Sequence, residues 1–172
     1  MDNTPILHLK DNLFTDFKGV KQLFNFYHNA LEYYNTTIFI DFYHLNWFDA
    51  NLTALFGSML HKLSIENNLK FSTDMNYLKE KFNVLFRNGF LNSDAEIIDA
   101  QKSTISFMSF SETDKTGYVN YIENDLLCHR GMPKIDATTK TKIIDALIEV
   151  YCNIQTHAKS TYPFFVCGQY FP

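Results

Sequence analysis

The stretch from residue 36 to residue 63 constrains the fold most, because it joins a strand-like run to a helix-like run through a short turn. Residues 38–45 are nearly all apolar and rich in β-branched and aromatic side chains, interrupted only by Asp41 and His44. A short run of this kind is typical of a strand that is buried on both faces. We expect the other elements to pack around this strand and the helix after it.

The helix after this strand is predicted to begin near Asp49, whose side chain can serve as an N-cap. Its apolar residues recur every three or four positions, which is the spacing of a helix that buries one face. These residues are Leu52, Leu55, Phe56, Met59, Leu60 and Leu63. Strand, tight turn and helix therefore form one predicted unit.

Strand-like and helix-like segments alternate through the first two thirds of the chain. Strands are predicted at residues 6–9, 38–45, 69–75 and 103–110, and helices at 16–34, 52–67 and 78–88. This alternation predicts an α/β fold, with helices packed on a sheet. The polar, glycine-containing segment 111–117 is a candidate domain boundary. Two further helices and a closing strand are predicted after it, at residues 119–131, 136–159 and 162–172.

Composition and charge exclude several classes of protein. The net charge is −4 and no run of Lys or Arg occurs, so we expect neither a nucleic-acid partner nor binding to an anionic membrane. No apolar run approaches the roughly 18 residues that a membrane span needs, and the N-terminus does not resemble a signal peptide. We therefore expect a cytoplasmic protein. The 3 Cys residues lack the spacing of a zinc site or a disulfide framework.

The strand IFIDF and the following NWFDANLTALFGSML resemble the STAS domain, the fold of anti-sigma-factor antagonists. The resemblance implies a STAS-like mixed sheet with packed helices over residues 1–112. In that family the turn reads Asp-Ser-Ser/Thr-Gly, and its phosphorylated Ser breaks partner binding. Asp49 matches the Asp, but Ala50 and Asn51 occupy the hydroxyl positions. The resemblance thus implies the fold and a protein partner, without the phosphorylation switch.

A second resemblance lies in EVYCNIQTHA, residues 149–158, which is similar to the N-box of the Bergerat-fold ATPases, the histidine-kinase-like (GHKL) group. The matching residues are Glu149, Asn153, His157 and Ala158. Spacing by four places the three polar residues, Glu149, Asn153 and His157, along one stripe of a helix. A stripe of polar residues is also what an ordinary solvated helix face presents. The resemblance implies that residues 113–172 form the helix-helix-strand opening of such an ATPase domain.

The family resemblance also implies roles for these residues. Glu149 would be the catalytic base, Asn153 would hold the magnesium ion that bridges the ATP phosphates, and His157 would lie close to those phosphates. The nucleotide site of the family also needs an Asp-x-Gly-x-Gly motif and a glycine-rich lid, neither of which occurs before Pro172. We therefore expect the chain to be the first part of a longer protein. No cofactor is expected on this chain, and ATP with magnesium only in a longer form.

Two functions follow from these resemblances. One is a regulatory protein-interaction module of a bacterial signalling protein of the anti-sigma, partner-switching type. The other is an ATP-binding kinase or ATPase. The closing strand, PFFVCGQYF, is apolar on both faces, so it needs a neighbour. It packs on the two preceding helices, pairs with the N-terminal sheet, or pairs with another copy of the chain, and we expect self-association.

Overall fold

The structure is a computed structural model that describes residues 4–92, 99–100, 102–154, 156 and 161–170. Its elements follow in the order β1 (Ile6–Leu13), α1 (Phe17–Ala30), β2 (Thr37–Phe48), the 3₁₀ turn η1 (Ala50–Leu52), α2 (Thr53–Glu66), β3 (Lys70–Ser72), α3 (Met75–Lys81), α4 (Val84–Arg87), β4 (Thr104–Phe110), α5 (Lys115–Tyr121), the π-helical turn η2 (Ile122–Leu126), α6 (Ala137–Asn153) and β5 (Phe164–Gln169). The predicted α/β class is confirmed.

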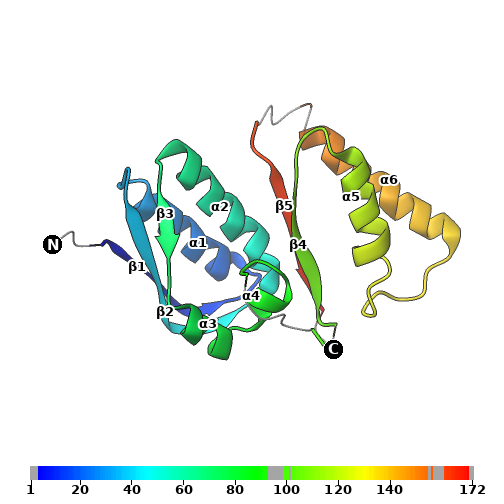
Figure 1. Ribbon diagram of the computed structural model, residues 1–172. Helices are drawn as coiled ribbons and strands as arrows, with labels where there is room; N and C mark the ends of the chain where they lie inside the picture. The colour runs from blue at the N-terminus through cyan, green and yellow to red at the C-terminus, as the bar shows by residue number, and fades with distance from the viewer. Residues whose placement is uncertain (1–3, 93–98, 101, 155, 157–160, 171–172) are drawn as a thin grey trace.

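The first three strands form one parallel sheet in the order β1-β2-β3. Parallel neighbours need a crossover connection, and α1 and α2 provide the two crossovers. Both helices lie on the same face of the sheet, between it and the second half of the chain (Figure 1). Side chains from this face of the sheet and from both helices make the main core: Leu9, Leu13, Leu23, Phe26, Ile40, Phe42, Phe56 and Met59.

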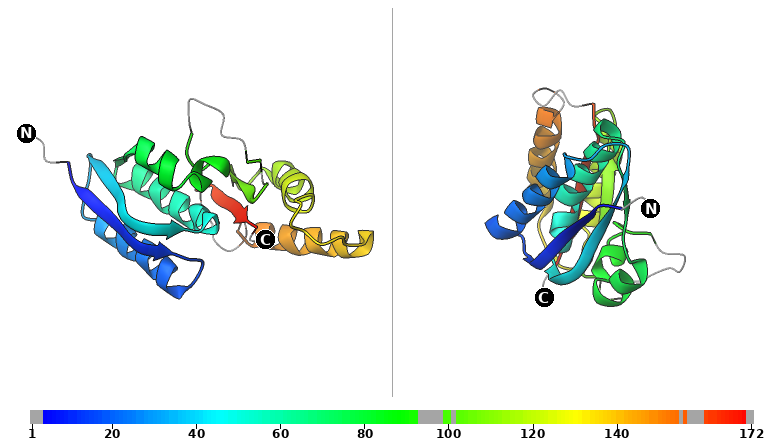
Figure 2. Two further views of the ribbon diagram at one scale, coloured as in Figure 1. Left: turned by 90° about the horizontal axis from the view of Figure 1, so that it is seen from below. Right: turned by 90° about the vertical axis from the view of Figure 1, so that its left-hand side faces the viewer.

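The prediction that the central strand is buried on both faces is wrong. Ile38, Ile40 and Phe42 are buried under the helices, whereas Tyr43 is 51% and Trp47 is 44% exposed. Helices α1 and α2 cover only one face of the sheet, and the opposite face is turned outward in the right-hand view of Figure 2. The apolar run therefore does not mean a doubly covered strand here.

The last two strands form a separate antiparallel sheet, in which Thr104 lies opposite Gln169 and Phe110 lies opposite Phe164. Strand β4 falls within residues 1–112 and β5 within residues 113–172, so the hydrogen-bonded ladder crosses that predicted boundary. The closing strand thus has an intramolecular neighbour.

Both faces of this two-stranded sheet are covered. On one face, Phe107 packs against α2 so closely that a Cβ on Gly57 would come within 2.8 Å of its ring. On the other face, α5, η2 and α6 build a second core with β4 and β5, in which Phe110, Tyr118, Tyr121, Ile122 and Tyr151 are buried. The elements therefore stack as sheet, helices, sheet and helices, from left to right in Figure 1. No helix within the described residues is long and apolar enough to cross a bilayer.

Candidate functional site

Helix α6 carries the two described residues of the predicted ATPase motif. It begins after Asp136, whose side chain accepts a hydrogen bond from the backbone N–H of Thr139 at 2.9 Å. Glu149 and Asn153 lie one turn apart near its end, and both side chains are exposed. Between them Tyr151 points the other way, into the second core, where it is 1% exposed. These two residues of the predicted stripe therefore face away from the core.

Glu149 and Asn153 belong to no group of metal ligands among the described residues. His157 and Ala158 lie outside the described residues. Within the described part of the chain, no three His, Cys, Asp or Glu residues form a group that could hold a metal ion. Asn153 therefore offers a single amide oxygen, and with Glu149 it does not complete the oxygen-rich shell that magnesium prefers.

The turn between β2 and α2 is more enclosed than α6. Asp49 is 6% exposed, and its carboxylate joins two loops. Oδ2 accepts hydrogen bonds from the backbone N–H of Thr15 at 2.6 Å and from its hydroxyl at 2.9 Å, and Oδ1 accepts one from Trp47 Nε1 at 2.7 Å. Asp49 occupies the predicted N-cap position, with extended backbone angles, but its side chain makes no hydrogen bond that caps the following turn.

Strand β5 closes over this turn from the far end of the chain. The backbone N–H of Ala50 donates to Oε1 of Gln169 at 2.7 Å, and the Cys167 thiol donates to the carbonyl oxygens of Ala50 and Asn51 at 3.1 and 3.3 Å. Burial raises the pKa of the Cys167 thiol, which keeps it protonated and able to donate. Ala50 and Thr53 are fully buried. Of the matched STAS positions, Asp49 and Ala50 are therefore buried, whereas Asn51 is half-buried.

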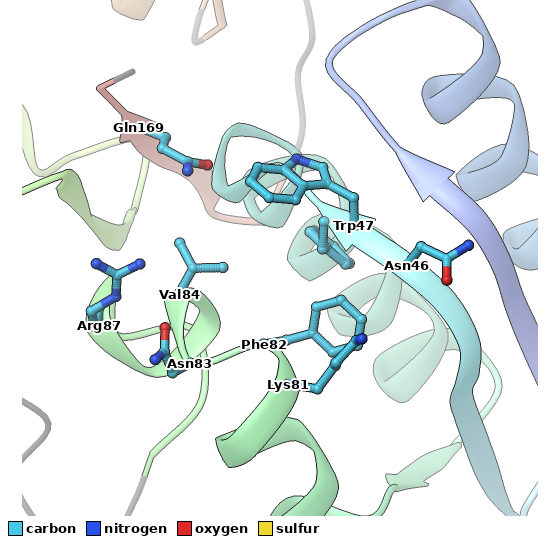
Figure 3. Close-up of a pocket in the computed structure, with 9 residues that line it drawn as sticks. Asn46, Trp47, Lys81, Phe82, Asn83, Val84, Arg87 and Gln169 are labelled. Atoms are coloured by element: carbon cyan, nitrogen blue, oxygen red, sulfur yellow. The ribbon is translucent and has the colours of Figure 1, made fainter. Parts of the chain in front are cut away.

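A small cavity of about 140 Å³ lies beside this contact. Figure 3 shows Gln169 and Trp47 on one side of it, with Phe82, Val84 and Arg87 opposite. Ligand pockets for drug-sized molecules have volumes of about 300–1,000 Å³. The cavity is therefore too small for a nucleotide.

Further contacts join residues 4–92 to residues 99–170, and we call the whole set the junction. Arg87 Nη1 lies 3.2 Å from Asp99 Oδ1, and the backbone N–H of Phe107 donates to the carbonyl of Asn88 at 2.6 Å. Rings continue the contact: Phe107 packs edge-on against Phe90 with centroids 5.1 Å apart, and Phe165 packs edge-on against His61 at 5.5 Å. The junction thus combines an ion pair, backbone hydrogen bonds and apolar packing.

The sequence did not point to Gln169 or Cys167, because each is a single polar residue in an otherwise apolar strand. Both contact Ala50. Gln169 accepts a hydrogen bond from the Ala50 N–H, 119 positions earlier in the chain, and Cys167 donates one to the Ala50 carbonyl, 117 positions earlier. Hydrophobic periodicity gives no signal for a contact at that separation. No family model, curated protein or solved structure matches the chain.

Proposed function

We propose that the chain is a regulatory protein-interaction module of the partner-switching type, in which the turn before α2 is the interaction element. The observation that carries the proposal is the enclosure of Ala50 by β5, through the 2.7 Å hydrogen bond to Gln169. We call this turn, residues 49–52, the α2 turn. It is held by a segment more than 100 residues away, as a docked protein partner would hold it.

The nature of the contacts supports an interface of this kind. Inter-domain interfaces within a chain resemble transient protein interfaces, which are more polar than permanent ones. The junction includes the Arg87–Asp99 ion pair and the side-chain hydrogen bond of Gln169, together with the packing of Phe107 on Phe90 and of Phe165 on His61. Such a mixed surface favours reversible docking over permanent burial.

The experiment that tests the proposal separates the two halves without altering the junction. A protease site placed between Asn92 and Asp99 allows the purified chain to be cut after folding. We expect the two pieces to elute together on gel filtration at micromolar concentration, and Gln169→Ala to weaken their association. Pieces that elute separately would show that the junction cannot act as a protein–protein interface.

The alternative function is an ATP-binding kinase or ATPase of the histidine-kinase-like group. Its support is the exposure of Glu149 and Asn153 on one stripe of α6, where a ligand can reach both. A carboxylate and an amide at this spacing suit a base and a magnesium ligand. Calorimetry with ATP and magnesium discriminates between the two. Micromolar binding that Asn153→Ala abolishes would favour the ATPase, and the absence of heat would favour the interaction module.

We also propose that β5 supports self-association. In the described residues β4 is the only strand paired with β5, so the second edge of β5 has no strand beside it. An edge with unpaired N–H and C=O groups is a template for pairing with another chain.

A further inference from the structure

A second, larger cleft lies on the side of β4 that faces η2. It has a volume of about 360 Å³, and its walls come from α4, from the segment before β4, from β4 itself, and from η2 and the segment after it. None of its lining residues belongs to the α2 turn or to the stripe of α6. The cleft is therefore separate from both sites described above, although Arg87 also contributes to the cavity in Figure 3.

Cations exceed carboxylates in the lining of this cleft. Arg87, Lys102 and Arg130 come from three different segments, and they face two acids, Asp99 and Asp125. The protein as a whole carries a net charge of −4, so the surplus of positive side chains in this cleft is opposite in sign to the charge of the whole protein. The cleft thus concentrates positive charge that the overall composition does not predict.

The two carboxylates are already turned toward protein donors. Asp99 Oδ2 accepts hydrogen bonds from both the backbone N–H and the hydroxyl of Thr104 at 2.8 Å, and Asp99 Oδ1 pairs with Arg87. Asp125 Oδ1 accepts a hydrogen bond from the Ser106 hydroxyl at 3.3 Å.

Two of the three cationic side chains have fewer protein partners than the carboxylates do. Within the described residues, Lys102 has no ion-pair or hydrogen-bond partner for its amino group, and Arg130 has only a ring contact, 6.0 Å from the centroid of Tyr170. Two positive side chains at the cleft are therefore available to a ligand.

Two buried N–H donors point to a missing acceptor. Arg87 Nε and His129 Nε2 are buried and have no hydrogen-bond partner among the described residues, and both side chains line the cleft. The backbone N–H of Gly131 donates to His129 Nδ1 at 3.1 Å, so the neutral ring carries its proton on Nε2. Because buried polar groups are nearly always paired, two such donors beside one cleft indicate that an acceptor belongs nearby.

The segment that bears His129 and Arg130 is held firmly in place. The ring of Tyr170 lies so close to Gly131 that a Cβ there would come within 2.3 Å of it, and the His129 ring packs edge-on against the same tyrosine at 6.1 Å. A larger residue at position 131 would displace this segment. The donors on one wall of the cleft are therefore fixed relative to β5.

We propose that this cleft binds a phosphate group on a small polar molecule. Phosphate presents oxygens in several directions, which matches cations on three walls, whereas a carboxylate presents only two. Guanidinium groups suit phosphate geometry, and Arg87 and Arg130 supply two of them. The volume of about 360 Å³ exceeds what a lone ion fills and lies at the lower end of the range for ligand sites. Of the residues lining the cleft, only His129 has a ring, which favours a phosphorylated small molecule over a nucleobase.

The test is a titration of the full chain followed by ³¹P NMR, with inorganic phosphate and with glycerol phosphate as probes at constant ionic strength. We expect saturable broadening of both signals, tighter binding of the monoester, and no displacement by an equal concentration of acetate. Displacement by acetate, or broadening that rises linearly without saturation, would overturn the proposal.

Variants locate the binding. The double substitution Lys102→Gln with Arg130→Gln changes two exposed side chains, and we expect it to weaken phosphate binding at least tenfold without lowering the melting temperature. Lys18→Gln with Lys21→Gln removes two exposed charges from α1, far from the cleft, and should leave the affinity unchanged. Equal affinity in both double variants would show that binding elsewhere explains the signal.

A third variant tests the buried donor. His129→Phe keeps a ring against Tyr170 but removes Nε2, and we expect a severalfold loss of affinity. His28→Phe, at an exposed histidine on α1, is the matched control and should have no effect. Unchanged affinity in His129→Phe would remove His129 from the site, and unchanged affinity in the Lys102 and Arg130 variant as well would reject the site.

Discussion

The backbone N–H of Ala50 donates a 2.7 Å hydrogen bond to Oε1 of Gln169, which lies 119 positions further along the chain. Ala50 is fully buried, so water cannot replace this acceptor without movement of β5. The bond therefore couples the exposure of the α2 turn to the position of the last strand. A signal that displaced β5 would expose the turn, and a partner that bound the turn would displace β5.

The hydrogen exchange of Ala50 tests this coupling. Gln169→Ala removes the acceptor, and because a typical hydrogen bond contributes about 0.5–1.5 kcal/mol, we expect exchange of the Ala50 amide to accelerate roughly 2- to 10-fold. Gln22→Ala is the matched control, since Gln22 accepts from the backbone N–H of Lys10 at 2.7 Å but lies outside the junction. Unchanged protection of Ala50 in Gln169→Ala would disprove the coupling.

Phe56 is the central side chain of the first core. It is 1% exposed and its ring lies 5.3 Å from Phe26, 6.1 Å from Phe48 and 5.9 Å from Phe90, measured between centroids. We expect Phe56→Ala to lower the free energy of unfolding by about 3–5 kcal/mol, measured by urea denaturation.

The control for Phe56 is another phenylalanine in a helix. Phe17 begins α1 and is 82% exposed, so Phe17→Ala should change the free energy of unfolding by no more than about 0.5 kcal/mol. Similar losses in the two variants would show that α2 does not form the core as described.

In the segment 49–53, Thr53 is the only residue with a hydroxyl group. We expect no phosphorylation of this segment by an ATPase-type kinase. The side chain of Thr53 is fully buried, donates to the carbonyl of Ala50 at 2.7 Å and accepts from Asn88 Nδ2 at 2.9 Å. A kinase cannot reach this hydroxyl without unfolding the turn. Phosphopeptide mapping after incubation with kinase and ATP checks the prediction, and a modified Thr53 would contradict it.

The same hydroxyl contributes to stability. Thr53→Val keeps the shape of the side chain but leaves the buried amide of Asn88 without its acceptor, which should cost about 1–3 kcal/mol in urea denaturation. Ser58→Ala on the same helix removes a hydroxyl that donates only to the carbonyl of Leu55 at 2.8 Å, and its effect should be smaller.

The local part of the fold could be predicted from the sequence, because it depends on neighbours three or four positions apart. The spacing of Leu52, Phe56 and Leu63 places α2 correctly, and the alternation of strands and helices gives the α/β class. The open face of β2 could not be predicted from its apolar run. Whether a second layer covers Tyr43 depends on where distant helices pack, and both crossover helices pack on the other side.

The candidate sites follow the same division. The spacing of Glu149 and Asn153 predicts one exposed stripe on α6, since helical geometry alone determines it. The junction depends instead on contacts between distant segments, such as that of Ala50 with Gln169, 119 positions apart. No periodicity within β4 or β5 specifies that Phe107 will pack against Phe90 or that Phe165 will pack against His61.

Asp99 gives the junction a dependence on pH. Burial opposes its ionisation, but hydrogen bonds from Thr104 and the charge of Arg87 outweigh that effect and lower the pKa of Asp99 below its usual range. The folded chain therefore binds this proton less readily than the unfolded chain. The resulting stabilisation is complete above the unfolded pKa of about 4 and is lost as the pH falls through the folded value.

Asp99→Asn should accordingly destabilise the protein at neutral pH, with a difference from the unsubstituted chain that shrinks in acid. Urea denaturation at about pH 7 and about pH 3 measures both differences. Asp145→Asn, at an exposed carboxylate on α6, serves as the control and should change little at either pH. A loss of stability for Asp99→Asn that is equal at the two pH values would rule out the ionised carboxylate as its cause.

Self-association through β5 is the last prediction. The backbone N–H of Tyr170 donates to the carbonyl of Ser103, and in an antiparallel ladder the next pair, Thr104 with Gln169, directs its backbone groups away from the partner strand. The N–H of Gln169 therefore points to the edge of β5 that has no neighbouring strand in the described residues. A second chain that paired there would bury this amide.

Light scattering should thus give an average mass that rises with concentration. Hydrogen exchange of the Gln169 amide should slow over the same range, whereas that of Ala50 should not change, because its acceptor lies within the chain. Substitution of Phe165 by Lys is unsuited to this test, since Phe165 packs against His61 of α2 and its loss would open the junction itself. A constant mass of one chain at every concentration would mean that the edge of β5 does not mediate association.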